Sequence, residues 1–255
     1  MRRREKFVIS TILLIVSFFA LQYLSLEWRY WGVAVFGVVT YFVCTWALSD
    51  DLQLYERLTI VPLPAMYAIS VALFYFLLPS SLLSRTGLLI LFGLGLYALL
   101  LTCNIFSVAK GRTIQLLYAA SAVGFLIVLL TSMLFSSIIF SLKLPFWANG
   151  LLVGLVHYPL VFMSLWSVNL EDFIAKDLLI YSLAISVFLT ELAILLSLVP
   201  IPVWNASLFI TGIIYLVLGI LHSFLRGRLF KNTTREYSLM ALLLATLFII
   251  FFPLK

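Results

Sequence analysis

The chain has 255 residues, of which 64% are hydrophobic and 10% are charged. A soluble domain has about 45–50% apolar and about 25% charged residues, so this composition excludes a water-soluble globular fold and predicts a protein embedded in lipid. The formal net charge of +6 does not indicate a nucleic-acid partner, because basic residues gather in the cytoplasmic loops of membrane proteins.

A basic N-terminal segment precedes the first apolar run. The segment Met1-Arg-Arg-Arg-Glu-Lys6 resembles the start of a signal peptide. The run that follows is about 20 residues long and lacks a cleavage site of small residues. We therefore expect an uncleaved first helix over residues 7–26.

Apolar runs of spanning length recur along the rest of the chain. Each crossing of a bilayer needs about 20 mostly apolar residues. Charged residues or prolines separate nine such runs, which cover residues 7–26, 30–48, 61–78, 88–108, 114–135, 146–168, 178–199, 205–224 and 237–253. Residues 136–144 are expected either to lengthen the fifth helix or to lie at the interface. The sequence predicts an all-α, polytopic transmembrane helix bundle of about nine spans, in one integral membrane domain over residues 1–255.

The distribution of lysine and arginine predicts the orientation of the bundle. With the N-terminus in the cytoplasm, the outside segments hold only Arg29, Arg85, Lys143 and Lys255. All other basic residues then fall on the cytoplasmic side, which is the usual bias. We expect a bacterial cytoplasmic membrane, with the N-terminus inside and the C-terminus outside.

Short sequence matches indicate an internal duplication. Residues 68–71 (AISV) recur as residues 184–187, and the Lys-Gly-Arg of residues 110–112 recurs as Arg-Gly-Arg at 226–228. An acidic segment also follows both the second and the sixth run. These matches predict a leading helix (1–29) and two parallel four-helix units (30–135 and 146–253). Chance similarity between apolar helices is the alternative.

Two ionisable side chains, His157 in the sixth run and Glu191 in the seventh, are expected deep in the membrane. Such groups are costly there and need a partner. Their helices are joined by a short loop, so we expect the two side chains to meet in the bundle interior. The pair could move a proton or bind a cation, or each residue could only tie helices together. Gly150 and Gly154 form a GxxxG pattern that predicts close helix packing.

Charged loop residues form two further candidate groups. Carboxylates on the cytoplasmic side could hold Mg²⁺ and a diphosphate, although the DxxxD spacing of prenyltransferases is missing and helix capping is the alternative. These carboxylates are Asp50, Asp51, Glu56, Glu171, Asp172 and Asp177. Basic residues before the last run could contact anionic lipid heads or could only set the topology. They are Arg226, Arg228, Lys231 and Arg235.

Three functions remain open on these observations. The first is a carrier or channel-like protein for a small solute, ion or lipid, with His157 and Glu191 near the pathway. The second is a membrane-embedded enzyme that acts on lipid-linked substrates through the cytoplasmic carboxylates. The third is a non-catalytic assembly or scaffold subunit. The sequence has no HExxH, GxSxG or P-loop motif and only two histidines, so no cofactor, metal or catalytic residue is predicted and enzymatic activity is not favoured.

Overall fold

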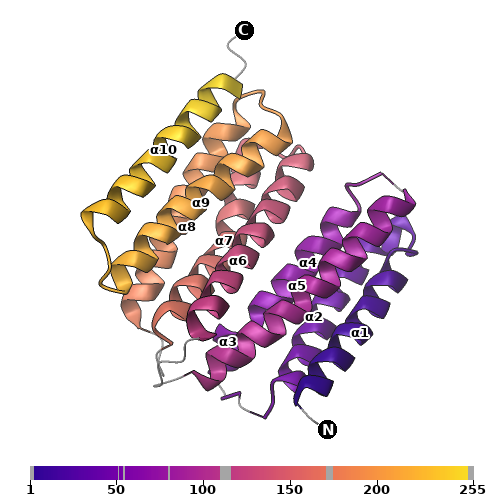
Figure 1. Ribbon diagram of the computed structural model, residues 1–255. Helices are drawn as coiled ribbons and strands as arrows, with labels where there is room; N and C mark the ends of the chain where they lie inside the picture. The colour runs from indigo at the N-terminus through magenta and orange to yellow at the C-terminus, as the bar shows by residue number, and fades with distance from the viewer. Residues whose placement is uncertain are drawn as a thin grey trace. The chain divides into compact units, whose positions relative to one another are not determined.

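The computed structural model describes residues 3–50, 52–53, 55–79, 81–109, 116–170 and 175–251, and all regular structure within these ranges is helical. Figure 1 labels the long helices in chain order: α1 (Arg3–Leu21), α2 (Arg29–Ala47), α4 (Pro62–Tyr75), α5 (Leu82–Val108), α6 (Leu116–Ser141), α7 (Phe146–Asn169), α8 (Lys176–Ser197), α9 (Val203–Leu225) and α10 (Lys231–Phe251). Two short helices, η1 (Leu26–Trp28) and α3 (Glu56–Thr59), precede α2 and α4.

The predicted all-α, multi-pass class is confirmed by the described residues. Eight helical segments are long and apolar enough to cross a membrane, with α3 and α4 together forming one of them. The first predicted span corresponds to α1, which is shorter than the predicted run and ends at Leu21. α1 is not among the eight, because its first turn contains four charged residues. They are Arg3, Arg4, Glu5 and Lys6. The fifth predicted helix is lengthened, because α6 continues to Ser141.

Prolines and one glycine mark the helix ends at the positions that their backbone chemistry favours. Pro62 is the first residue of α4, where a missing N–H costs nothing. Pro145 and Pro202 directly precede α7 and α9. Gly227, with a φ of +63°, follows the end of α9, and this left-handed conformation is the usual C-terminal stop of a helix.

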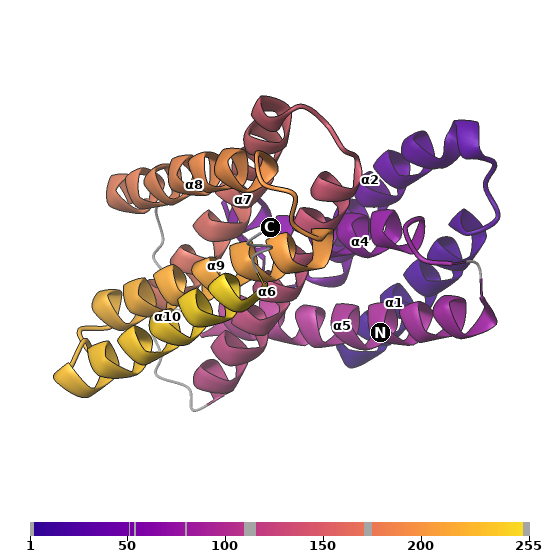
Figure 2. The same cartoon turned by 90° about the horizontal axis from the view of Figure 1, so that it is seen from above.

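The chain divides into two compact units, residues 1–131 and 132–255, with the boundary inside α6. In unit 1, four helices form a ring in which α1 contacts α2 and α5, and α4 contacts the same two helices (Figure 2). In unit 2, α7 packs against α8 and α9, and α10 lies along α9 in both views.

An aromatic cluster fills the centre of unit 1, with one ring from each of the four helices. The ring of Phe92 lies 5.1 Å from that of Phe18, 5.7 Å from that of Phe36 and 6.1 Å from that of Tyr67, measured between centroids. The hydroxyl of Tyr67 donates a hydrogen bond of 2.8 Å to the carbonyl oxygen of Leu91. Packing of these aromatic rings therefore stabilises unit 1, and the buried hydroxyl of Tyr67 has a hydrogen-bond partner.

Candidate functional site

The imidazole of His157 is completely buried in unit 2 and links two helices. Its Nδ1 lies 2.7 Å from the carbonyl oxygen of Val153 in the preceding turn of α7, and its Nε2 lies 2.9 Å from Oγ of Ser132 in α6. Because a carbonyl oxygen only accepts, Nδ1 must carry a proton. In the neutral ring, Nε2 then accepts the hydrogen bond from the Ser132 hydroxyl. Both ring nitrogens are therefore engaged.

Further polar side chains join α7 to the other helices of unit 2. Nδ2 of Asn149 donates to Oγ of Ser197 at the end of α8, over 3.1 Å. Near the opposite end of α7, Oγ of Ser164 lies 3.1 Å from Nε2 of His222 in α9. Polar contacts thus connect α7 to α6, α8 and α9. Interhelical hydrogen bonds of this kind stabilise membrane bundles by roughly 0.6 kcal/mol on average.

The GxxxG pattern of α7 lies directly against α8, as its spacing predicts. A Cβ atom at Gly150 would lie 3.0 Å from the carbonyl oxygen of Thr190, and one at Gly154 would lie 3.3 Å from that of Ser186. The hydroxyl of Ser186 donates to the carbonyl oxygen of Gly154 over 2.5 Å. The absence of side chains at both glycines therefore lets the two backbones approach closely, so that the Ser186 side chain reaches the backbone of α7.

The predicted meeting of Glu191 with His157 is wrong. His157 is buried as predicted, but Glu191 is exposed on α8. At 3.6 residues per turn, Glu191 is rotated by about 200° from the buried Leu189, which places it on the opposite side of the helix. The nitrogens of His157 are already occupied by Ser132 and Val153.

Half of the predicted acidic group lies outside the described residues. Asp51, Glu171 and Asp172 are not described, whereas Asp50 is exposed and accepts a 2.6 Å hydrogen bond from Nζ of Lys6. This hydrogen bond holds the pKa of the Asp50 carboxyl below its usual range. Asp50 is solvent-exposed and Lys6 is partly so, and an ion pair at such a surface contributes little to stability. Among the described residues, no three His, Cys, Asp or Glu side chains gather into a metal-binding group.

Glu56 is a buried carboxylate that sequence reasoning assigned to a cytoplasmic loop. It is 0% exposed at the start of α3. Its Oε2 accepts hydrogen bonds of 2.8 Å from the backbone N–H of Gln53 and from the hydroxyl of Ser107 near the end of α5. Glu56 lies three residues after Gln53, a spacing that resembles half of a capping box. This spacing is the sequence feature from which the bond to the Gln53 backbone could have been predicted. Glu56 thus fastens the connection between α2 and α4 to α5.

The basic candidates for lipid contact lie around the connection between α9 and α10. All four side chains are exposed there: Arg226, Arg228, Lys231 and Arg235. Their position suits either a topology signal or contact with lipid heads, so the lipid contact stays a prediction.

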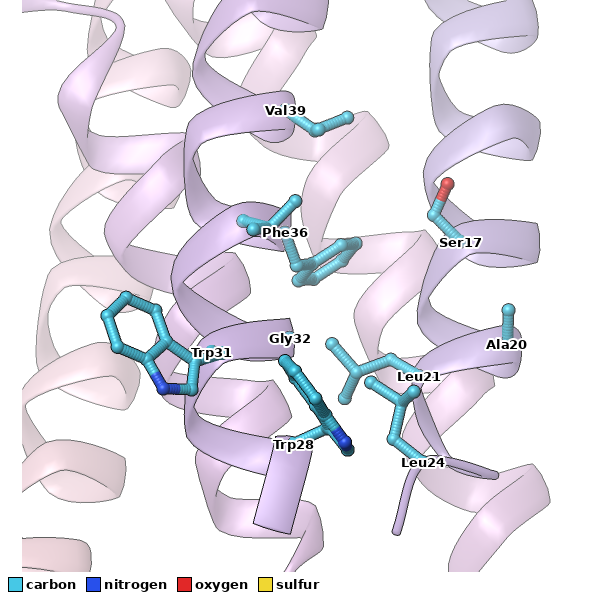
Figure 3. A pocket seen from close by; sticks show the side chains of 10 residues that line it. Ser17, Ala20, Leu21, Leu24, Trp28, Trp31, Gly32, Phe36 and Val39 are labelled. Atoms are coloured by element: carbon cyan, nitrogen blue, oxygen red, sulfur yellow. The ribbon is translucent and has the colours of Figure 1, made fainter.

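Two apolar grooves are present in the described part of the chain. One, of about 700 Å³, lies between α1 and α2 in unit 1 (Figure 3), and the other, of about 200 Å³, lies between α9 and α10 in unit 2. Neither is lined by His157 or Glu191. These grooves therefore do not provide the water-reachable cavity that a carrier site built on those two residues requires.

Comparison with protein families, with curated proteins and with solved structures finds no match for the chain.

Proposed function

We propose that the chain is a non-catalytic subunit of a membrane protein assembly, and that the outer face of α8 around Glu191 binds a membrane helix of a different protein. The observation that carries the proposal is the exposure of one carboxyl group on an otherwise apolar helix face.

One face of α8 carries exposed apolar residues every three or four positions, except at position 191. They are Ile180, Leu183, Val187 and Leu195, and Leu198 continues the series just past the end of the helix, whereas Leu179 and Phe188 are exposed beside this face. Glu191 takes the place in this stripe between Val187 and Leu195. Apolar residues suit a surface that meets lipid, whereas a charged group within a membrane helix is costly, by up to roughly 3 kcal/mol at the helix centre on insertion scales.

The geometry of the helix prevents Glu191 from escaping to interfacial water at the nearer end of α8. The residue lies about two turns before α8 ends at Ser197. Side chains of an α-helix tilt toward its N-terminus, so the carboxyl points away from that end. It therefore does not reach the interface as long basic side chains do. A hydrogen-bond donor on a neighbouring helix would remove this cost.

A second copy of this chain is a poor source of that donor. Symmetric pairing of two α8 faces would bring two Glu191 carboxyl groups into one apolar interface, where like charges oppose each other. The adjacent hydroxyl of Thr190 already donates to the carbonyl oxygen of Ser186 over 2.9 Å. The expected partner is therefore a helix of another protein that presents Ser, Thr, Asn, His or a basic residue at this depth.

Other contacts in unit 2 favour an assembly role over transport. His157, Asn149 and Ser164 each bond to a neighbouring helix. A carrier needs polar groups that face a shared, water-filled pathway instead. α10 adds a second apolar lateral surface, since none of the residues in its membrane-spanning part is buried. The enzyme alternative depends on Asp50, Asp51, Glu171 and Asp172, of which the last three lie outside the described residues.

Photo-crosslinking in the native membrane tests the proposed interface. A benzophenone amino acid at Val187 or Leu195 flanks Glu191 by about one turn on each side. Both positions should crosslink to the same membrane helix, and that helix should carry a donor or basic side chain. The variant Glu191→Leu should reduce this adduct at least about tenfold, because the partner's polar group then meets only apolar surface.

Controls separate loss of binding from loss of folding. Glu191→Leu should keep or raise the melting temperature of the purified chain, because it removes a polar group from an apolar face. A benzophenone at Ile12, which is exposed on α1, should not give the same adduct. Adducts to lipid alone, adducts within the chain itself, or a partner adduct that persists in Glu191→Leu would each overturn the proposal.

A further inference from the structure

The larger apolar groove, in unit 1, ends beside aromatic residues of the kind found at membrane interfaces. It runs between the C-terminal half of α1 and the N-terminal half of α2. Figure 3 shows Trp28 beside Leu24 near one end and Val39 at the other. Trp28 and Trp31 are 62% and 71% exposed. Exposed tryptophans mark the head-group level of a bilayer, so this end of the groove is expected near the lipid heads.

The groove itself suits a hydrocarbon chain. Its volume of about 700 Å³ falls within the usual range for ligand sites, roughly 300–1,000 Å³. Apolar side chains form most of its lining, and Ser17 is the only hydroxyl among the lining residues. The Ser17 hydroxyl already donates to the carbonyl oxygen of Leu13 over 2.9 Å. An occupant therefore gains from apolar contact and finds little to bond with along the groove.

Two arginines are connected to the end of the groove that carries the tryptophans, one by its place in the chain and one by the aromatic ring that it contacts. Arg29 directly follows Trp28, and its guanidinium carbon lies 4.8 Å from the ring centroid of Phe76. The guanidinium carbon of Arg85 lies 5.7 Å from the ring centroid of Tyr23, next to Leu24 of the groove. In both arginines Nε is buried without a hydrogen-bond partner. Within the described ranges, neither guanidinium forms a salt bridge with a carboxylate.

We propose that this groove holds one acyl chain of an anionic phospholipid whose phosphate lies on Arg29 and Arg85. Stacking on an aromatic ring uses the face of a guanidinium and leaves the edge with its two terminal Nη groups available, although Nε is buried. That edge matches the geometry of a phosphate, which can accept two parallel hydrogen bonds. Arg29 and Arg85 are two of the few basic residues expected on the outer side of the membrane. An anionic head group beside them would supply the acceptor that both guanidinium groups need. This proposal concerns unit 1 and does not depend on the interface around Glu191.

Native mass spectrometry of the purified full-length chain tests the head-group contact. The protein is reconstituted in nanodiscs of equal phosphatidylglycerol and phosphatidylcholine, and the lipids retained after release are counted. We expect preferential retention of phosphatidylglycerol. The double variant R29Q/R85Q should lower that retention at least about tenfold. The matched double variant K143Q/K176Q removes the same charge from two exposed positions in unit 2 and should leave retention unchanged.

A second pair of variants tests the acyl-chain contact. Ala20→Phe fills the groove from an exposed lining position, whereas Ala34→Phe adds the same ring at an exposed position of α2 outside the groove. Only Ala20→Phe should release the lipid, and Ser17→Phe serves the same purpose if Ala20→Phe does not fold. Equal losses in R29Q/R85Q and K143Q/K176Q would show generic charge binding and overturn the proposal. Undiminished retention with the groove filled would overturn it as well.

Discussion

Replacing Gly154 with leucine should destabilise unit 2 by about 3 kcal/mol, near the upper end of the usual cost of overpacking. A side chain at this position meets Oγ1 of Thr190 and the backbone carbonyl of Ser186. The threonine hydroxyl can rotate, but the carbonyl moves only if α8 moves. Separation of α7 and α8 would also break the hydrogen bond from the Ser186 hydroxyl to the Gly154 carbonyl. The effect is measured by heating the purified chain and monitoring the remaining folded protein by size-exclusion chromatography.

A matched control and a double-mutant cycle isolate the cause. Gly87→Leu introduces the same side chain into α5 at a position with nothing within 4 Å, and it should be nearly neutral. Gly154→Ala should destabilise less than leucine, and adding Thr190→Ala should restore part of the loss by removing the nearest obstacle. A coupling energy of about 1 kcal/mol is expected between the two positions. Independent, additive effects would contradict direct packing of Gly154 on Thr190.

His157→Leu should cost about 1–2 kcal/mol, because it removes both side-chain hydrogen bonds of a buried group and leaves the Ser132 hydroxyl without its partner. The two amide replacements should separate these bonds. The amide of glutamine can reach the position of Nε2, so His157→Gln should preserve the link to Ser132 and most of the stability. The shorter His157→Asn can replace only the contact with the Val153 carbonyl and should resemble leucine more closely.

The variant Ser132→Ala checks that the link between α6 and α7 is the origin of this effect. It should lose stability on its own and should add little to the loss caused by His157→Leu, since both remove the same bond. If His157→Gln and His157→Leu were equally destabilised while Ser132→Ala was neutral, the hydrogen bond between the two helices would not be the stabilising contact.

The positions of the long helices could be predicted because lipid imposes a simple rule on the sequence. Every run of spanning length had to be helical, since a lipid-exposed backbone must satisfy its own hydrogen bonds. The prolines at 62, 145 and 202 then fixed several helix starts. The end of α1 was harder, because apolar residues continue past Leu21 although the helix does not.

The partners of polar residues could not be predicted in the same way. His157 and Glu191 both lie in apolar helices. Each of these helices carries apolar residues on all of its faces, so the periodicity of its sequence does not reveal which face is buried. The structure turns His157 toward Ser132 and turns Glu191 outward. Glu56 was missed for a related reason, because its partner Ser107 lies far along the chain at the end of α5.

The predicted duplication remains a prediction, as does the orientation of the chain in the membrane. The boundary between the compact units falls at residue 131, close to the end of the first proposed repeat at residue 135. The most extensive helix contacts in the two units join α2 with α4 and α7 with α8, which are equivalent pairs under the proposed duplication. Superposition of residues 30–135 on residues 146–253 is the comparison that decides it.

Thiol accessibility at position 191 distinguishes a membrane-facing interface from a water-filled pathway most directly. The two native cysteines, Cys44 and Cys103, are buried, so the variant Glu191→Cys adds one informative thiol. A charged, membrane-impermeant thiol reagent is applied to each side of native membranes in turn. The variant should react at less than about one-tenth of the rate of the exposed loop control Arg228→Cys. Labelling of position 191 at the loop rate from either side would place it in water and contradict the assembly interface.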